Sequence, residues 1–478
     1  MLLPERIARM SPTSEASETN VLNGLTMRYA THVAALSFED MPEAVVEKAK
    51  LILRDGVGNE IAASAISEPA NRMVSLVEEW GGAPQSTIVG HGSRVPAPHA
   101  ALVNAMMGHG VELDDAHGSG LIKAGSVLVP SGFAVAELSG ATGRDMLTSL
   151  VAGYDVAIRV AKAINPGHRQ RGYHTSGTVS GIGAAAMCAK LLGCNPEQIA
   201  SAIGLACMQS AGIQSYLDDP CMAKPFSPGK AAFNGVIAAI MASRGFTGPK
   251  KALESREGFF NAFTDNVRLS DLDADLGRHF SIMEVGFKPH SACRYAHGPI
   301  DLAQQAYREG VQLGRVRSIS VGMSELAIRQ ASKPVCPNLN AAMGSTQFGV
   351  ALALEAGSNG LREYWDGYKN PTVHEGAKMI ELRPEAAFGL GGRQAKIEIV
   401  LNDGRAVAYS SVEPKGEPSN PLSAGDLEAK FFAMATMVVD AAQARRVSDL
   451  VMTLESQPKA AVIPKATTVA DGPSLRAA

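Results

Sequence analysis

The chain has 478 residues, of which 46% are hydrophobic and only 5% aromatic, and its formal net charge is −3 at pH 7. This length exceeds what one hydrophobic core normally covers, so two or three domains are expected, and the near-neutral charge excludes the basic surface of a nucleic-acid-binding protein. The six cysteines contain no C-x-x-C pair, which excludes the common zinc motifs, and no apolar run reaches the ~18 residues of a membrane-spanning helix.

Residues 1–20 contain no continuous apolar core, so they predict a disordered N-terminal extension of a cytoplasmic protein rather than a secretory signal. Residues 21–268 are expected to form a large helical domain. Met41-Pro42-Glu43 is predicted to open one of its helices, with Asp40 as the cap and Pro42 in the first turn, and residues 85–95 predict a short surface hairpin. Five later segments are apolar nearly all round, as is typical of interior helices: Gly125–Gly140, Met146–Ile164, Thr178–Leu192, Pro196–Gln209 and Lys230–Gly245.

Residues 269–415 have a different pattern, which predicts a smaller α+β lid domain. Residues 316–323 alternate in a strand-like way. A turn at Asn402-Asp403-Gly404, typical of a tight hairpin, separates two further strand-like segments. These segments are Ala395–Leu401 and Ala406–Val412, and a helix is predicted over Phe348–Ala356.

The last part of the chain returns to a helical pattern. Residues 416–457 are expected to pack back on the helical domain, and residues 458–478, rich in Ala, Pro and Thr, predict a disordered tail. The expected fold class is therefore mainly α, with a large all-helical domain and a smaller α+β lid domain.

The most informative segment runs from Gly108 to His117 and packs three carboxylates and two imidazoles into ten residues. Asp, Glu and His respond strongly to charged neighbours, so clustering them creates groups that can move protons near neutral pH. The alternative is a solvated acidic loop, but apolar runs on both sides, residues 100–107 and 127–138, favour a pocket. The five side chains are His109, Glu112, Asp114, Asp115 and His117.

Two further segments carry candidate polar groups at helix starts. His174 is expected just before a helix N-terminus, whose field disfavours an imidazolium, so it is either a neutral acid–base group or a structural histidine. Lys224 lies in a loop that Pro225 and Pro228 stiffen. It either binds a substrate carboxylate or oxyanion or is a solvated surface charge.

Residues 287–299 contain Lys288, His290, Arg294 and His297, which is typical of a substrate-facing edge. His290 and His297 can share one helical face, but no third ligand follows at metal-like spacing, so a zinc site is disfavoured. The sequence also lacks the glycine-rich nucleotide-binding motifs, the G-x-S-x-G nucleophile motif and the H-E-x-x-H metal motif.

Five ordered motifs, within residues 22–457, resemble those of the MmgE/PrpD family, which includes 2-methylcitrate dehydratase, cis-aconitate decarboxylase and iminodisuccinate epimerase. The motifs are His109-x-x-Glu112-Leu113-Asp114-Asp115, Gly172-Tyr173-His174, Met222-Ala223-Lys224, the helix start from Pro228 to Gly235, and Cys293-x-x-x-His297-Gly298-Pro299. The resemblance implies a lyase or isomerase without metal or cofactor, a homodimer, and an active site between a large helical domain and a smaller α+β lid. The shared chemistry that it implies is proton transfer next to a substrate carboxylate.

The resemblance also implies roles for individual residues. It carries Glu112, His174, Lys224 and His297 over from the family motifs. Together with the clusters above, the candidate catalytic residues are His174, Lys224, Lys123, Glu112, Asp115 and His297, and the candidate substrate-binding residues are His109, Asp114, His117, Arg294 and Lys288. Two positions depart from the family pattern, because Lys123 stands where many members have a histidine and Phe348 where the decarboxylase has a tyrosine. An ammonium group at position 123 is a fixed positive charge unless burial lowers its pKa, and a phenylalanine cannot donate a proton.

The favoured function is therefore a metal-independent hydro-lyase that dehydrates a small hydroxylated di- or tricarboxylate. The first alternative is an epimerase or isomerase of a related carboxylate. The two departures disfavour a decarboxylase of the cis-aconitate type. A non-catalytic relative that binds a carboxylate is the remaining alternative, and neither nucleic acid nor membrane is expected as a partner.

Overall fold

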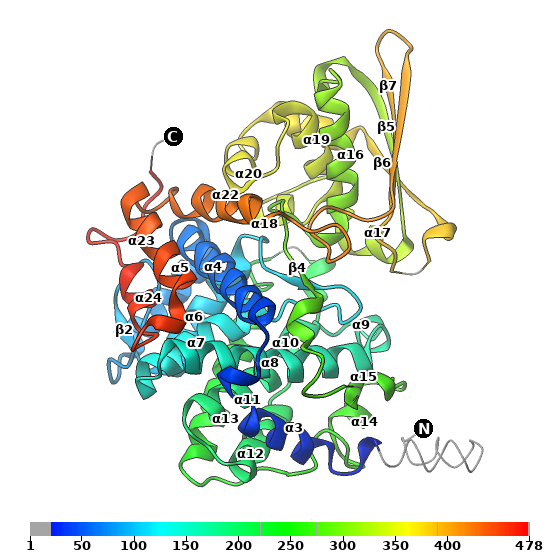
Figure 1. Cartoon of the computed structure of the whole chain (residues 1–478). Coiled ribbons are helices and arrows are strands. Elements are labelled where there is room, and N and C mark those ends of the chain that lie inside the picture. The colour runs from blue at the N-terminus through cyan, green and yellow to red at the C-terminus, as the bar shows by residue number, and fades with distance from the viewer. Residues whose placement is uncertain (1–20, 220, 274, 390, 477–478) are drawn as a thin grey trace, which may run out of the picture.

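The computed structural model describes residues 21–219, 221–273, 275–389 and 391–476. Figure 1 shows a larger helical body and a smaller part that carries the main sheet, so the fold is mainly α, as predicted. The smaller part, residues 292–411, is called the lid below. The predicted extension over residues 1–20 lies outside the described residues. Within the described ranges, no helix is both long enough and apolar enough to cross a membrane.

The centre of the helical body consists of helices that are buried on nearly all sides, as predicted for interior helices. One of them, α11, packs against the four others, so these helices form the core of the body. Their bounds lie within a few residues of the expected ones: α7 (Gly125–Ser139), α8 (Gly143–Ile164), α11 (Ser180–Leu191), α12 (Pro196–Met208) and α13 (Phe226–Ser243).

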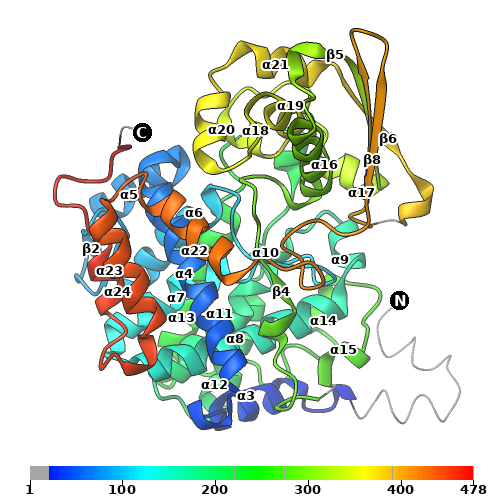
Figure 2. The ribbon, with the colours of Figure 1, turned by 45° about the horizontal axis from the view of Figure 1, so that its top comes forward.

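The long helix α4 (Glu43–Ile66) packs against α22 (Ala424–Ala435) on one side of the body (Figure 2). Its N-cap is Pro42, and no side chain caps it, so the prediction that Asp40 caps this helix is wrong. The Asp40 carboxylate instead accepts hydrogen bonds from the main-chain N–H and the hydroxyl of Ser37, at 2.8 and 2.7 Å. Because the Asp40 carboxylate makes these hydrogen bonds to a residue three positions earlier, it does not cap α4.

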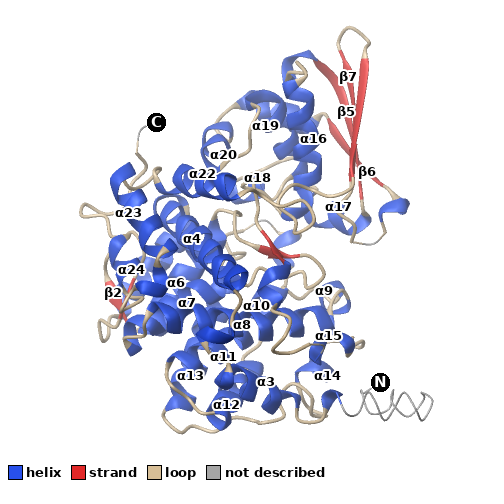
Figure 3. Cartoon of the chain, in the orientation of Figure 1, coloured by secondary structure: helices blue, strands red, loops and turns tan. Residues whose placement is uncertain are grey.

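The lid contains a four-stranded sheet in the order β6-β5-β7-β8, drawn in red in Figure 3. Strands β5 and β6 are parallel, and the other neighbouring pairs are antiparallel. Three of the strands were predicted, and the hairpin turn contains Gly404 at φ 87°. Strand β6 was not predicted, because it is a short edge strand with mostly exposed side chains. The bounds are β5 (Val316–Met323), β6 (Ile380–Pro384), β7 (Ala395–Leu401) and β8 (Ala406–Ser411).

Two lid helices, α16 (His297–Arg308) and α19 (Thr346–Ala356), pack against each other, and α16 also packs against β7. The side chains of β7 alternate between buried and more exposed positions, so its apolar face supports α16. The start of α16 follows the segment that carries Cys293 and Arg294. The first turn of α16 therefore lies next to Arg294, which contacts His297.

The chain returns to the helical body after β8. Helix α22 and helix α23 (Ala441–Met452) both contact α4. Residues 458–476 are not a disordered tail, because Ala460, Ile463 and Ala466 are buried and α24 (Val462–Ala466) packs on α23. The short apolar side chains of this segment bury enough surface to order it, which composition alone did not indicate.

The remaining elements are short or peripheral. Strands β1 and β2 form the predicted hairpin, and β3 pairs with β4 below the lid. The bounds are α3 (Leu25–Ala35), α5 (Glu68–Trp80), β1 (Ser86–Thr87), β2 (Arg94–Val95), α6 (Ala97–Gly110), β3 (Ala116–His117), α9 (Gly167–Gln170), α10 (Thr175–Thr178), α14 (Phe259–Phe263), α15 (Ser270–Asp273), β4 (Val285–Gly286), α17 (Glu325–Ala331), α18 (Leu339–Met343), α20 (Leu361–Gly367) and α21 (Pro371–Lys378).

Candidate active site

A cavity between the helical body and the lid is lined by six basic side chains, and is called the cationic cavity below. They are Lys123, Arg169 and Lys224 from the helical body and Arg294, Lys333 and Arg393 from the lid. Among the described residues, no aspartate or glutamate lines this cavity. Positive charges in low-dielectric walls raise the local concentration of anions, so the cavity suits a small polyanion.

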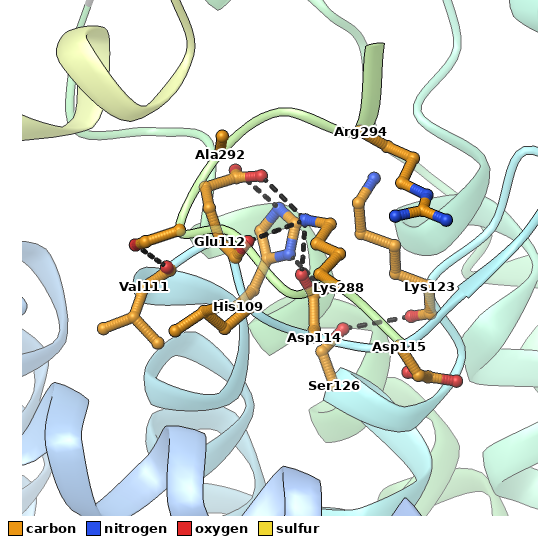
Figure 4. Close-up of polar contacts among 12 residues, drawn as sticks. His109, Val111, Glu112, Asp114, Asp115, Lys123, Ser126, Lys288, Ala292 and Arg294 are labelled. Atoms are coloured by element: carbon orange, nitrogen blue, oxygen red, sulfur yellow. Dashed lines mark hydrogen bonds and ion pairs between the residues drawn. The ribbon is translucent and has the colours of Figure 1, made fainter. Parts of the chain in front are cut away.

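Two carboxylates lie behind this wall, on either side of the Lys288 ammonium group (Figure 4). The Lys288 Nζ lies 3.1 Å from Glu112 Oε2 and 3.0 Å from Asp114 Oδ1, and it also donates to the Glu112 main-chain carbonyl at 3.0 Å. All three side chains are buried. Burial alone would raise the pKa of both carboxyl groups, but the neighbouring lysines outweigh it and hold both pKa values below their usual range.

The loop after α6 has an unusual backbone that aims Glu112 at two lysines. Glu112 has φ 55°, in the left-handed region that residues other than glycine rarely adopt. Its carboxylate contacts the Lys224 ammonium group as well as Lys288. Burial would lower the pKa of Lys224, but the Glu112 carboxylate raises it above its usual value, so Lys224 stays charged on the cavity wall.

His109 connects this carboxylate layer to the histidine on the cavity wall. Its Nδ1 lies 2.7 Å from Asp114 Oδ2, and its ring centroid lies 5.8 Å from that of His174. His109 is buried and is not part of the cavity lining. The structure therefore places His109 behind His174, between the cavity wall and Asp114.

Asp115 also lies behind the wall. Its Oδ2 accepts the Tyr154 hydroxyl at 2.7 Å, and its Oδ1 accepts the main-chain N–H of Gly125, the first residue of α7, at 2.9 Å. Burial raises the pKa of Asp115 to about 7. Because the bond to Gly125 fixes the start of α7, Asp115 positions the residues just before this helix, among them Lys123.

Lys123 lines the cationic cavity and lies near Arg294 in Figure 4. Its main-chain N–H donates to the Ser176 hydroxyl at 3.1 Å. Burial, followed by the charge of Lys288, lowers the pKa of Lys123 to about 8. The ammonium group at this position is therefore not a fixed charge but titrates close to neutral pH.

His174 lies on the cavity wall directly before α10, as predicted from its place ahead of a helix. Its main-chain N–H donates to the Gly212 carbonyl at 3.0 Å, and its buried Nδ1 has no partner among the described residues. Burial, followed by the charges of His109 and Lys123, holds the pKa of His174 well below its usual value. The imidazole is therefore neutral and can accept a proton.

The other expected site residues divide between the wall and the layer behind it. His117 lines the cavity, and its Nε2 lies 2.9 Å from Glu284. His297 is fully buried and does not line the cavity; its Nε2 donates to the Ala292 carbonyl at 3.1 Å and its Nδ1 accepts from Arg294 at 3.2 Å. His297 therefore positions Arg294, which does line the cavity.

Sequence reasoning missed three of the six cavity cations. Arg169 contacts Gln330 of the lid, and Arg393 contacts the Glu417 carboxylate. Lys333 lies in the loop between α17 and α18. Only Arg169 had a local signal, because it lies five residues before His174. Lys333 and Arg393 are brought to the cavity by the fold of the lid, which no local sequence pattern predicts.

The side chain of Phe348, which stands where the decarboxylase has a tyrosine, does not reach the cavity. It is fully buried in the lid, where its ring packs against Tyr364 and His374, and it is not part of the cavity lining. Two phenol groups, those of Tyr216 and Tyr295, do line the cavity. The presence of Phe348 is therefore a weak argument against any one reaction.

In the part of the chain that the structure describes, no group of three or more His, Cys, Asp or Glu side chains is arranged to hold a metal ion. Two of the buried carboxylates instead pair with basic side chains: Glu112 with Lys224 and Lys288, and Asp114 with Lys288 and His109.

Known families and proteins resemble the chain over nearly its whole length. The model of the MmgE/PrpD N-terminal domain matches residues 27–271, and that of the MmgE/PrpD C-terminal domain matches residues 290–456. The cis-aconitate decarboxylase-like protein oryM of Aspergillus oryzae is 27% identical, over 94% of this chain and 97% of its own. The cis-aconitate decarboxylases of Aspergillus terreus and Homo sapiens are each 24% identical, over 93% and 95% of this chain and 96% of their own. With both domain models matched in order, the chain belongs to the MmgE/PrpD family.

Proposed function

We propose that this protein is a lyase that acts on a small di- or tricarboxylate without a metal ion. The observation that supports this proposal is the cationic cavity, with basic side chains from both the helical body and the lid on its wall. Such a wall neutralises a polycarboxylate and stabilises the charge that develops when a bond next to a carboxylate breaks. Protein cations then have the role that a metal ion has in other lyases.

The first candidate reaction is the loss of water from a hydroxycarboxylate. His174, held neutral, is the base that removes the acidic proton next to a carboxylate. Lys123 is the acid that donates a proton to the leaving hydroxyl group. Lys224 and Arg294 bind the carboxylates and stabilise the negative charge between these two steps.

The second candidate is the loss of CO2 from an unsaturated tricarboxylate. The names of the relatives favour it, since several are cis-aconitate decarboxylases. Phe348 does not argue against it, because its side chain is in the lid core. In this reaction the electron pair of the broken C–C bond stays on the substrate, and Lys123 supplies the proton that the carbon then takes up.

Proton NMR of the purified protein in D2O, with methylcitrate, citrate, cis-aconitate, malate, citramalate and iminodisuccinate, tests the proposal. A vinyl signal that grows from a hydroxycarboxylate supports dehydration, and loss of CO2 from cis-aconitate supports decarboxylation. Deuterium entering Cα without a change of skeleton would move the assignment to an epimerase. No turnover of any of the six, together with thermal stabilisation by one of them, would refute the lyase and leave a binding protein. Turnover is expected to persist with a chelator present.

The rate is expected to fall at alkaline pH, because the proposed acid loses its proton. Since the pKa of Lys123 is about 8, kcat/KM should be highest below that pH and fall about tenfold per pH unit above it. The Lys123→Arg variant, which stays protonated, should be slower at neutral pH and lack this alkaline fall between pH 7 and about 10. The same alkaline fall in both proteins would contradict the assignment of Lys123 as the acid.

We also propose that the chain forms a homodimer, which the family resemblance supports. Light scattering coupled to size-exclusion chromatography is expected to give twice the mass of one chain at micromolar concentration. A mass equal to that of one chain, with the purified protein fully active, would contradict the dimer.

A further inference from the structure

Lys333 differs from most other cations of the cavity in that its charge has no counterion among the described residues. Lys224 contacts Glu112, and both Arg294 and Arg393 contact Glu417. No hydrogen bond or ion pair joins the Lys333 Nζ to any described residue. The charged group with the largest influence on it is Lys224, which is another cation and lowers the pKa of Lys333 further than burial alone.

The backbone at Lys333 is held in place by the start of α19. Its main-chain N–H donates to Gln347 Oε1 at 2.9 Å, and its carbonyl accepts the Ser345 hydroxyl at 2.6 Å. Ser345 is also the N-cap of α19, where it accepts the Phe348 N–H. The Ser345–Gln347 segment, which read alone is an ordinary helix start, therefore fixes the loop that carries this cation.

The space around the ammonium group is also kept open. Gly344 lies on the cavity wall, and a Cβ atom at that position would come within 3.3 Å of the Lys333 Nζ. A half-buried ammonium group that is held at its backbone, faces a cavity and lies among other cations is unfavourable in the empty protein. Binding of an anion removes that cost, so the arrangement favours a negatively charged group next to Lys333.

We propose that Lys333 is a specificity-determining residue that binds a third carboxylate of the substrate from the lid side of the cavity. This inference rests on the proposed function, and it narrows the substrate class from di- or tricarboxylates to tricarboxylates. Lys224 and Arg294 bind the two terminal carboxylates, and Lys333 binds the middle one. The substrate then joins the lid to the helical body, because Lys224 comes from the helical body and Lys333 from the lid.

Calorimetric titration with two unreactive probes tests this role without relying on turnover. Tricarballylate has three carboxylates, and glutarate has the same five-carbon chain without the middle one. The wild-type protein is expected to bind tricarballylate more tightly. In Lys333→Met, the Kd for tricarballylate should rise about 30-fold, the size expected for the loss of one hydrogen bond to a charged group, while the Kd for glutarate stays within about threefold.

Two further variants complete the test. Lys333→Arg keeps the charge and should restore most of the affinity for tricarballylate. Lys396→Met removes an exposed lysine that pairs with Glu385 on the sheet, and should change neither affinity. Equal losses for both probes in Lys333→Met would overturn the proposal, because they would show a general electrostatic effect rather than recognition of one carboxylate.

These outcomes separate the inference from the proposed function. If Lys333→Met loses tricarballylate selectively, the carboxylate subsite stands, even if no member of the substrate panel turns over. If the wild-type protein catalyses a lyase reaction but Lys333→Met keeps its full affinity for tricarballylate, the proposed function stands and the role of Lys333 is refuted.

Discussion

Replacing Lys224 with methionine is expected to lower kcat/KM for the substrate about 10³-fold while leaving the fold intact. Removing one donor that stabilises a developing negative charge typically costs a factor of about 10² to 10³ in rate, and Lys224 also binds the ground-state carboxylate. Lys224 stays protonated, because the Glu112 carboxylate raises its pKa. The fold should survive, because Lys288 still neutralises Glu112 in the variant.

The control for this experiment is Lys230→Met. Lys230 lies six residues later, at the start of α13, where its Nζ donates to Asn234 at 3.0 Å, and it is not part of the cavity lining. Steady-state kinetics with the panel member that turns over fastest should show a small effect for Lys230→Met. Lys224→Arg should recover part of the rate, because it keeps the charge but not the geometry. Similar rates in Lys224→Met and Lys230→Met would remove Lys224 from the mechanism.

The site has two layers of opposite charge, and the carboxylates of the inner layer determine the position and the protonation of the lysines in the outer layer. The cavity wall carries basic groups, and the residues behind it carry the carboxylates Glu112, Asp114 and Asp115. The inner carboxylates are not part of the cavity lining. They hold the lysines in position and set their charge: Glu112 keeps Lys224 protonated, whereas Lys123, without such a partner, titrates near neutral pH.

Sequence patterns predicted the central helices of the body, because these segments are apolar nearly all round. The segment 180–191, for example, contains one charged residue, and such a helix is stable only in an interior. The edge strand β6 was missed for the opposite reason, since its five residues are mostly exposed and leave little pattern. The segment around Ile463 was wrongly predicted to be disordered, because its burial depends on packing against α23. Composition does not predict this contact.

The candidate site was only partly predictable, for a related reason. Local clusters indicated Glu112, Asp114 and His174, but they did not indicate that His174 lies on the cavity wall and Glu112 behind it. That distinction depends on the left-handed backbone of Glu112 and on Lys288, which lies 176 residues away in the chain. Lys333 and Arg393 reach the cavity from separate segments of the lid, and no spacing in the sequence relates them to the helical body.

The largest expected effect on stability comes from replacing Lys288 with methionine. This side chain is fully buried and neutralises two buried carboxylates, Glu112 and Asp114. Removing one partner of a buried ion pair leaves an uncompensated charge and typically costs about 3–5 kcal/mol, so the free energy of unfolding should fall by that amount at pH 7. Urea denaturation followed by circular dichroism measures it.

A second variant identifies the cause of that loss. In the double variant Lys288→Met/Asp114→Asn, an uncharged amide replaces the carboxylate that would lose its lysine. About half of the lost stability should therefore return. Glu112 needs no such change, because it keeps its contact with Lys224. Lys396→Met, which removes an exposed ammonium group that pairs with Glu385 and lies over the Phe388 ring, should cost less than about 1 kcal/mol. If Lys288→Met were no less stable than Lys396→Met, the inner carboxylates would not depend on Lys288, and the two-layer account of the site would fail with it.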